Sequence, residues 1–96
     1  METFVYTLKL NKDYQDQSTW DKEAYEVIEK HYLRLKSDFE IGKVIHVGKT
    51  KNAIGGFGFI LFNEKSIEDA INYMNKDQAI KKGMMSGTCF SYQVIF

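Results

Sequence analysis

The amino-acid sequence predicts an α+β fold in which strands and helices follow the order β-α-β-β-α-β. Four runs show the alternating or continuous apolar character of strands, and two longer segments repeat apolar residues every three or four positions, as helices do. With 96 residues and no linker or repeat, we expect one domain over residues 1–96. This order is typical of ferredoxin-like sandwiches, in which a four-stranded antiparallel sheet carries two helices.

The first strand is predicted over residues 4–10, where every second side chain is apolar. Its apolar face consists of Phe4, Tyr6, Leu8 and Leu10. After a polar connection, Ser18 is the expected N-cap of a long helix, because its hydroxyl can accept a hydrogen bond from a free backbone amide. The apolar stripe of this helix comprises Trp20, Ala24, Ile28, His31, Tyr32, Leu35 and Phe39. The spacing puts His31 at the margin of the buried face.

The second and third strands are predicted over residues 43–47 and 57–62, joined by a connection over residues 48–56. The third strand is apolar on both faces, which is typical of a central strand covered on two sides. Ser66 is then expected to cap a second helix. The buried stripe of that helix comprises Ile67, Ala70, Ile71 and Met74.

The end of the chain contains one more turn and one more strand. Asp77 is the expected N-cap of a short helical turn over residues 78–82, which Gly83 ends in a left-handed conformation. The last strand is predicted over residues 88–96. Its apolar face consists of Phe90, Tyr92, Val94 and Phe96.

The strands carry apolar residues on both faces, although two helices can cover only one face of a four-stranded sheet. A monomer would therefore expose a large apolar patch. We expect a homodimer in which two sheets pack face to face.

The amino-acid composition indicates which binding partners and which cellular compartment to expect for this protein. Thirteen basic and thirteen acidic residues give a formal net charge of zero, which argues against nucleic-acid binding. No run approaches the roughly 18 apolar residues of a membrane span, so no membrane partner is expected. Cys89 is the only cysteine and cannot form a disulfide within the chain. A reducing cytoplasm is the expected location.

His31 and Asp77 are the two residues whose chemistry and position together suggest a site. An imidazole beside an apolar stripe can simply pack, with one nitrogen bonded to a backbone carbonyl. It is also suited to proton transfer near neutral pH, above all if a carboxylate fixes its tautomer. The simplest interpretation of Asp77 is a helix cap, and spacing alone does not place it beside His31.

Other candidates have weaker support. His46 alternates with Val44 on the second strand and is best interpreted as a surface or interface residue. The glycines of residues 55–58 lack the Lys-Ser/Thr of a phosphate loop and lead into a strand, not a helix. No metal or cofactor is expected, because neither histidine has accompanying ligands in the sequence.

Several short segments occur in the order and spacing of a known family. They are the first strand at 4–10, the helix segment 31–35, residues 41–44 running on to Gly48, the glycines before 59–62, the segments 66–70 and 77–83, and the strand segment 92–96. Together they resemble a YciI-like protein of the dimeric α/β-barrel superfamily, over nearly the whole chain. The resemblance implies that His31 and Asp77 form an active-site dyad. Two family prolines are absent, where Gln78 and Lys49 stand here.

These observations lead to a functional hypothesis. The chain is expected to be a small enzyme-like protein in which Asp77 orients His31, the general acid or base in an elimination, isomerisation or hydrolysis of a small organic, possibly aromatic, substrate. Tyr6 is the expected substrate-binding residue lining the pocket, although core packing explains it equally well. The alternative is a non-catalytic ligand-binding or stress-related dimeric barrel protein.

Overall fold

The computed structural model describes residues 1–52 and 55–96 and confirms the β-α-β-β-α-β order and the ferredoxin-like fold. The strands are β1 (Glu2–Leu10), β2 (Val44–Lys49), β3 (Gly58–Glu64) and β4 (Met85–Ser91). The helices are α1 (Lys22–Glu40), α2 (Ile67–Asn75) and the short α3 (Gln78–Lys81), and two 3₁₀ turns, Lys12–Tyr14 and Gln17–Thr19, lie between β1 and α1. The sheet is antiparallel in the order β2-β3-β1-β4.

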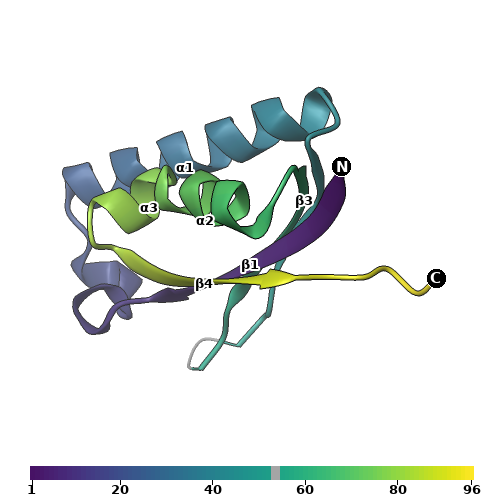
Figure 1. The fold of residues 1–96 in the computed structure, drawn as a ribbon. Helices are drawn as coiled ribbons and strands as arrows, with labels where there is room; N and C mark the ends of the chain where they lie inside the picture. The colour runs from purple at the N-terminus through teal and green to yellow at the C-terminus, as the bar shows by residue number, and fades with distance from the viewer. Residues whose placement is uncertain (53–54) are drawn as a thin grey trace.

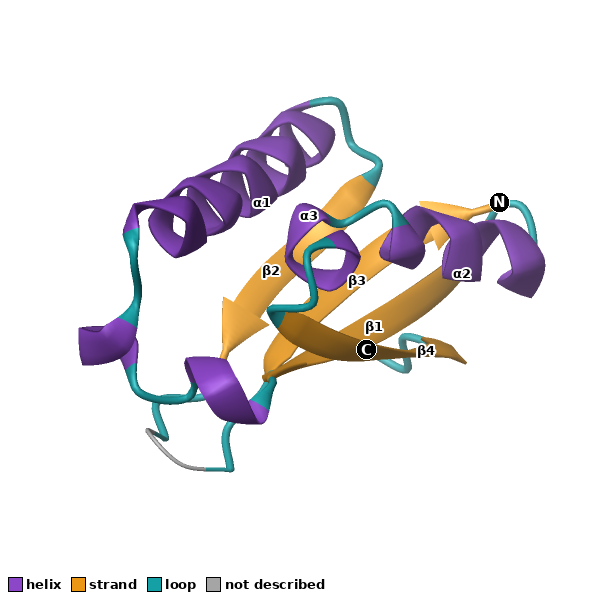
Figure 2. Ribbon diagram, turned by 90° about the vertical axis from the view of Figure 1, so that its left-hand side faces the viewer, coloured by secondary structure: helices purple, strands orange, loops and turns teal. Residues whose placement is uncertain are grey.

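All three helices lie on one face of the sheet (Figures 1 and 2). Side chains alternate between the two faces of β1, which gives the strand an apolar face for the helices to cover. Phe4, Tyr6 and Leu8 all point to this helical side and are buried there. β1 is central, so Tyr6 is flanked in register by Ile60 on β3 and Cys89 on β4. The side chains of β1 that point to the helical side are therefore enclosed by neighbouring strands and by the helices above them.

The start of α1 differs from the prediction. Asp21, not Ser18, is the N-cap, and its side chain accepts a hydrogen bond from the Ala24 amide at 2.9 Å. Ser18 belongs to a separate 3₁₀ turn, and Trp20 then returns to an extended conformation before the helix begins. The indole of Trp20 donates to the carbonyl of Tyr14, which ties the two segments together. Ser18 and Asp21 are both favourable N-cap residues and lie three positions apart, so the sequence alone does not show which of them begins the helix.

The predicted stripe of α1 was too wide. The buried residues are Ala24, Val27, His31 and Leu35, whereas Tyr32 is 43% exposed and Phe39 is also exposed. The prediction that His31 lies at the margin is wrong, because His31 occupies the middle of this narrower stripe.

The second helix and its cap agree better with expectation. The Ser66 side chain accepts a hydrogen bond from the Asp69 amide, which confirms the predicted cap. The buried residues of α2 are Ala70, Tyr73 and Met74, whereas Ile67 and Ile71 are exposed. Tyr73 takes a core position that the apolar pattern had given to the isoleucines, because its ring stacks on Phe62 of β3 with centroids 4.8 Å apart.

The boundaries of the later strands shift by a few residues. β4 begins and ends earlier than predicted, and residues 92–96 leave the sheet as an extended tail (Figure 1). The amide of Tyr92 still donates to the carbonyl of Thr3, but β1 begins at Glu2, so little partner strand remains beyond that point. The predicted connection over residues 48–56 lies partly outside the described residues.

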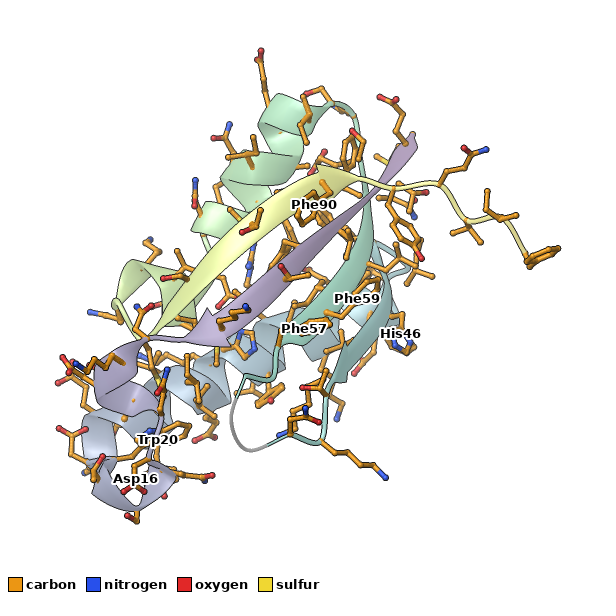
Figure 3. All side chains as sticks on the ribbon, turned by 90° about the horizontal axis from the view of Figure 1, so that it is seen from below. Asp16, Trp20, His46, Phe57, Phe59 and Phe90 are labelled. Carbon is orange, nitrogen blue, oxygen red and sulfur yellow. The ribbon has the colours of Figure 1, made fainter. Side chains whose placement is uncertain are left out.

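The sheet face opposite the helices is apolar, and no described helix covers it. The Tyr92 ring of the C-terminal tail lies against Phe59 on this face, with centroids 5.9 Å apart. Figure 3 looks onto it and shows Phe59 of β3 and Phe90 of β4 on this face, with His46 of β2 at its edge. Val5 and Leu61 lie between them in register with Phe90 and His46 respectively. None of the described helices is long and apolar enough to cross a membrane.

Candidate functional site

The fold brings His31 and Asp77 together, although 46 positions separate them in the sequence. Nδ1 of His31 lies 2.8 Å from each carboxylate oxygen of Asp77. His31 projects from the middle of α1, and Asp77 stands immediately before α3, which packs beside α1. Their exposed fractions are 3% and 0%. The predicted pair is therefore a direct, buried contact.

Local chain geometry holds Asp77 in place. Its amide donates to the carbonyl of Met74 at the end of α2, and its extended backbone interrupts the helix there. Oδ1 accepts a hydrogen bond from the Ala79 amide at 3.0 Å, so the predicted N-cap is confirmed. Gly83 then has a φ of 72°, as predicted, and turns the chain into β4.

Tyr6 contributes a third hydrogen bond to the same carboxylate. Its hydroxyl donates to Oδ2 of Asp77 at 2.8 Å, and the residue has no exposed surface. The ring packs edge-on against Phe62 of β3, with centroids 5.5 Å apart. Tyr6 was predicted to line a substrate pocket; the structure places it behind Asp77, where it fixes the carboxylate.

The ionisation of the site follows from these contacts. Burial raises the pKa of Asp77, but the hydrogen bonds from His31 and Tyr6 and the His31 charge outweigh it, so the net shift is downward. Burial and the neighbouring Asp77 raise the pKa of Tyr6 far above its usual range, and the Arg34 charge opposes them only in part. Asp77 is thus a carboxylate and Tyr6 a neutral phenol at physiological pH.

A carboxylate can only accept hydrogen bonds, so Nδ1 of His31 must carry a hydrogen. In the neutral ring this leaves the lone pair on Nε2, to which no described group is hydrogen-bonded. Among the described residues, the only fully buried side-chain nitrogen or oxygen without a partner is Nη1 of Arg34. Nε2 therefore accounts for part of the small exposed surface of the ring.

Two surface grooves lie near the pair without reaching it. The larger, about 470 Å³, runs between the N-terminal half of α1 and α3, and the smaller, about 250 Å³, lies between α1 and the segment around Trp20. Neither includes His31 or Asp77. The larger groove is lined by Val27, one turn before His31, and by Gln78, the residue after Asp77. The lining of this groove therefore includes chain neighbours of both residues of the pair.

The structure separates the remaining histidine from the site. His46 is exposed on the sheet face that the helices leave open, with its ring 6.2 Å from that of Phe59. It faces away from the side of the sheet on which His31 lies. In the described part of the chain, no three His, Cys, Asp or Glu side chains converge as metal ligands would.

Arg34 and Tyr73 are residues near the site that the sequence analysis missed. Arg34 Nη2 donates to the Tyr73 carbonyl at 2.7 Å, and its guanidinium carbon lies 4.1 Å from the centroid of the Tyr73 ring. The Tyr73 hydroxyl donates to Asp38. The available signal was spacing, since Arg34 follows His31 by three positions, which places both on one side of α1.

No protein-family model matches the sequence, and comparison with curated proteins finds no match. The arrangement that the structure establishes is a ferredoxin-like α+β sandwich with a buried histidine–aspartate pair between its helices and its sheet.

Proposed function

We propose that this chain is a YciI-like protein whose His31–Asp77 pair performs general acid–base chemistry on a small organic molecule. The observation that carries the proposal is the 2.8 Å contact between Nδ1 and the carboxylate, with Nε2 left without a partner in the described chain. A histidine held in this tautomer can take a proton at Nε2, and the carboxylate then stabilises the imidazolium.

The surrounding residues support the same assignment of roles. Asp77 is an orienting and charge-stabilising residue, and Tyr6 is a positioning residue, because its hydroxyl donates to the carboxylate of Asp77 and reaches His31 only through it. Proton transfer at one nitrogen suits an elimination, an isomerisation or a hydrolysis, each of which needs a proton moved to or from carbon or oxygen. Acid–base catalysis by a positioned side chain contributes about 10²–10⁴-fold to a rate.

The substrate is expected to enter through the larger groove. Val27 and Gln78 line this groove, and His31 is only 3% exposed, so neighbouring side chains must move aside for a molecule to reach Nε2. Movement of α3 relative to α1 would suffice, because α3 is short and joined to its neighbours by a turn on each side.

The proposal is tested by screening small organic compounds, aromatic ones included, for turnover by the wild type, two variants of the pair and one control variant. His31→Gln and Asp77→Asn should each lower the rate by about 10²–10⁴-fold, whereas His46→Gln should retain full activity because His46 lies on the other sheet face. Melting curves of each variant show that it remains folded. Full turnover in His31→Gln would reject the proposal.

A non-catalytic ligand-binding role is the second candidate, and the near-complete burial of both residues favours it. In that case the pair holds α1 against α3 and the ligand binds in the groove. The same screen separates the candidates, since a compound that binds and is recovered unchanged supports this role.

We also propose that the protein forms a homodimer through the open sheet face. Phe90 is 49% exposed there, and Phe57 is exposed on the same face. Tyr92, whose ring lies 5.9 Å from that of Phe59, is also exposed. With a formal net charge of zero, two copies have no net repulsion to overcome. A second copy supplies an identical apolar face, which is the simplest cover for it.

A reducing compartment such as the cytoplasm is the location that we infer. The only cysteine, Cys89, is unpaired in the structure. Burial raises the pKa of its thiol, which keeps the reactive thiolate scarce.

A further inference from the structure

The only arginine of the chain has a buried nitrogen without a partner. Arg34 Nη2 is bonded to the Tyr73 carbonyl, and the guanidinium lies against the Tyr73 ring. Nη1 is fully buried and finds no hydrogen-bond partner among the described residues. A buried donor left unpaired is costly, and more so when it carries a charge. Such a group calls for a partner from outside the described chain.

The nearby carboxylates are already engaged. Asp77 accepts from His31, Tyr6 and the Ala79 amide, and Asp38 accepts from the Tyr73 hydroxyl. The ion pairs of the described residues involve lysines and His31, and none of them includes Arg34. The guanidinium therefore has no protein counter-ion in the described part of the chain.

Arg34 also stands beside the proposed reaction centre. It follows His31 by three positions on α1, so the two side chains are neighbours on one side of the helix. On the other side of the site, the Tyr73 ring that Arg34 covers lies 6.3 Å, centroid to centroid, from Tyr6, which bonds Asp77. Two nitrogens without partners among the described residues, His31 Nε2 and Arg34 Nη1, thus come from positions about one turn apart on one helix.

We propose that the molecule on which His31 acts is a small organic carboxylic acid, and that Arg34 Nη1 binds its carboxylate. This inference rests on the proposed function and specifies the class of its substrate. Arginine pairs well with carboxylates, and the contacts to Tyr73 hold this guanidinium in one orientation before the ligand arrives. Arg34 then fixes the acid while His31 exchanges a proton with another part of the molecule.

A carboxylate fits the local charge better than a phosphate does. Arg34 supplies a single positive charge, and the nearest other cation on the Tyr73 ring, Lys43, is paired with Glu64 at 2.6 Å. One uncompensated charge matches a monoanion. Because Nη1 is covered in the structure, the acid must displace neighbouring side chains as it binds.

The test follows the side-chain signal of Arg34 by NMR in the full-length ¹⁵N-labelled protein. The chain contains no other arginine, so its Nε–H signal identifies itself. Sodium benzoate is the probe, with inorganic phosphate as a second anion and sodium chloride at equal ionic strength as the salt control. The ring signals of His31 are recorded in the same titration. Benzoate should move the Arg34 and His31 signals together and to saturation.

Two variants complete the experiment. Arg34→Lys keeps the charge but loses the planar donors, and it should weaken benzoate binding, measured at the His31 signals, by about tenfold or more. Lys36→Gln removes a charge from an exposed position on the same helix and should leave the affinity unchanged.

Three results would overturn the inference: an Arg34 signal that benzoate does not move, a response to phosphate alone, or an unchanged affinity in Arg34→Lys. Failure of the acid–base chemistry is distinguishable from these results. It would appear as full turnover in His31→Gln and would not alter the Arg34 titration.

Discussion

Asp77 is the residue that joins the parts of the site, because its buried carboxylate accepts hydrogen bonds from His31, Tyr6 and the Ala79 amide. Its two roles, helix cap and partner of His31, are compatible because each uses the charged form. The sequence predicted the cap from local chemistry. It did not predict the Tyr6 contact, since that hydrogen bond joins positions 71 apart and depends on how the whole sheet folds.

Replacing Tyr6 with phenylalanine tests the contribution of its hydroxyl. Tyr6→Phe keeps the ring in the core and removes one hydrogen bond to a charged acceptor, so the free energy of unfolding should fall by about 1.5–3 kcal/mol. Urea denaturation measures the change. Tyr32→Phe, at an exposed position, is the control and should change stability little. Equal stability of the two variants would show that the Tyr6 bond contributes nothing.

The direction in which the free energy of unfolding changes with pH is defined at both acidic and alkaline pH. Asp77 has a lowered pKa in the folded protein, so its stabilising effect is present above about pH 4, the unfolded value, and is lost as the pH falls through the folded value. The pKa of Tyr6 is raised, so its contribution is present below about pH 10 and is lost at higher pH.

Denaturation at a series of pH values checks both signs. Asp77→Asn should lose stability relative to the wild type near neutral pH and approach it below pH 4. Tyr6→Phe should show a smaller loss of stability than the wild type above pH 10. Parallel curves for the wild type and both variants would contradict the ionisation states assigned here.

At the scale of elements, the turn through α3 connects the site to the sheet. Gly83 ends α3 with a positive φ of 72° and starts the chain toward β4, and the Met84 amide donates to the Ala79 carbonyl to close the turn. The sequence predicted this turn because its signals are local. It predicted the buried face of α1 less well, because neighbouring elements decide which of several apolar residues is covered.

Gly83→Ala should therefore destabilise the fold through backbone strain alone. No atom lies within 4 Å of the position that a Cβ would take, so the cost should be the left-handed penalty of about 1–2 kcal/mol. Gly58→Ala is a matched control, because φ is ordinary there and the added Cβ would make ordinary contacts. Thermal melts that show no difference between the two variants would contradict this explanation.

At the scale of the whole molecule, one sheet face is covered by helices and the other is apolar and open. A chain of 96 residues buries a limited core, so a partner that covers this face would add stability. The sequence indicated the two apolar faces of the central strand. The pattern could not show that the final residues leave the sheet, because this depends on where β1 begins.

The proposed homodimer makes a mutational prediction. Phe90→Asp places a charge on the open face, on the edge strand β4, and should yield a monomeric mass by light scattering at micromolar concentration, where the wild type should be dimeric. Leu33→Asp, at an exposed position on α1, should leave the dimer intact. A monomeric wild type would reject the proposed interface.

The tautomer of His31 is the most direct test of the proton-transfer site, and ring ¹⁵N NMR measures it. In the neutral form of the ring, the geometry predicts hydrogen on Nδ1 and a lone pair on Nε2, because Asp77 can only accept. Asp77→Asn should disturb this preference, since an amide can also donate. Hydrogen on Nε2 in the neutral ring of the wild type, with Nδ1 bare, would contradict the proposed role of His31.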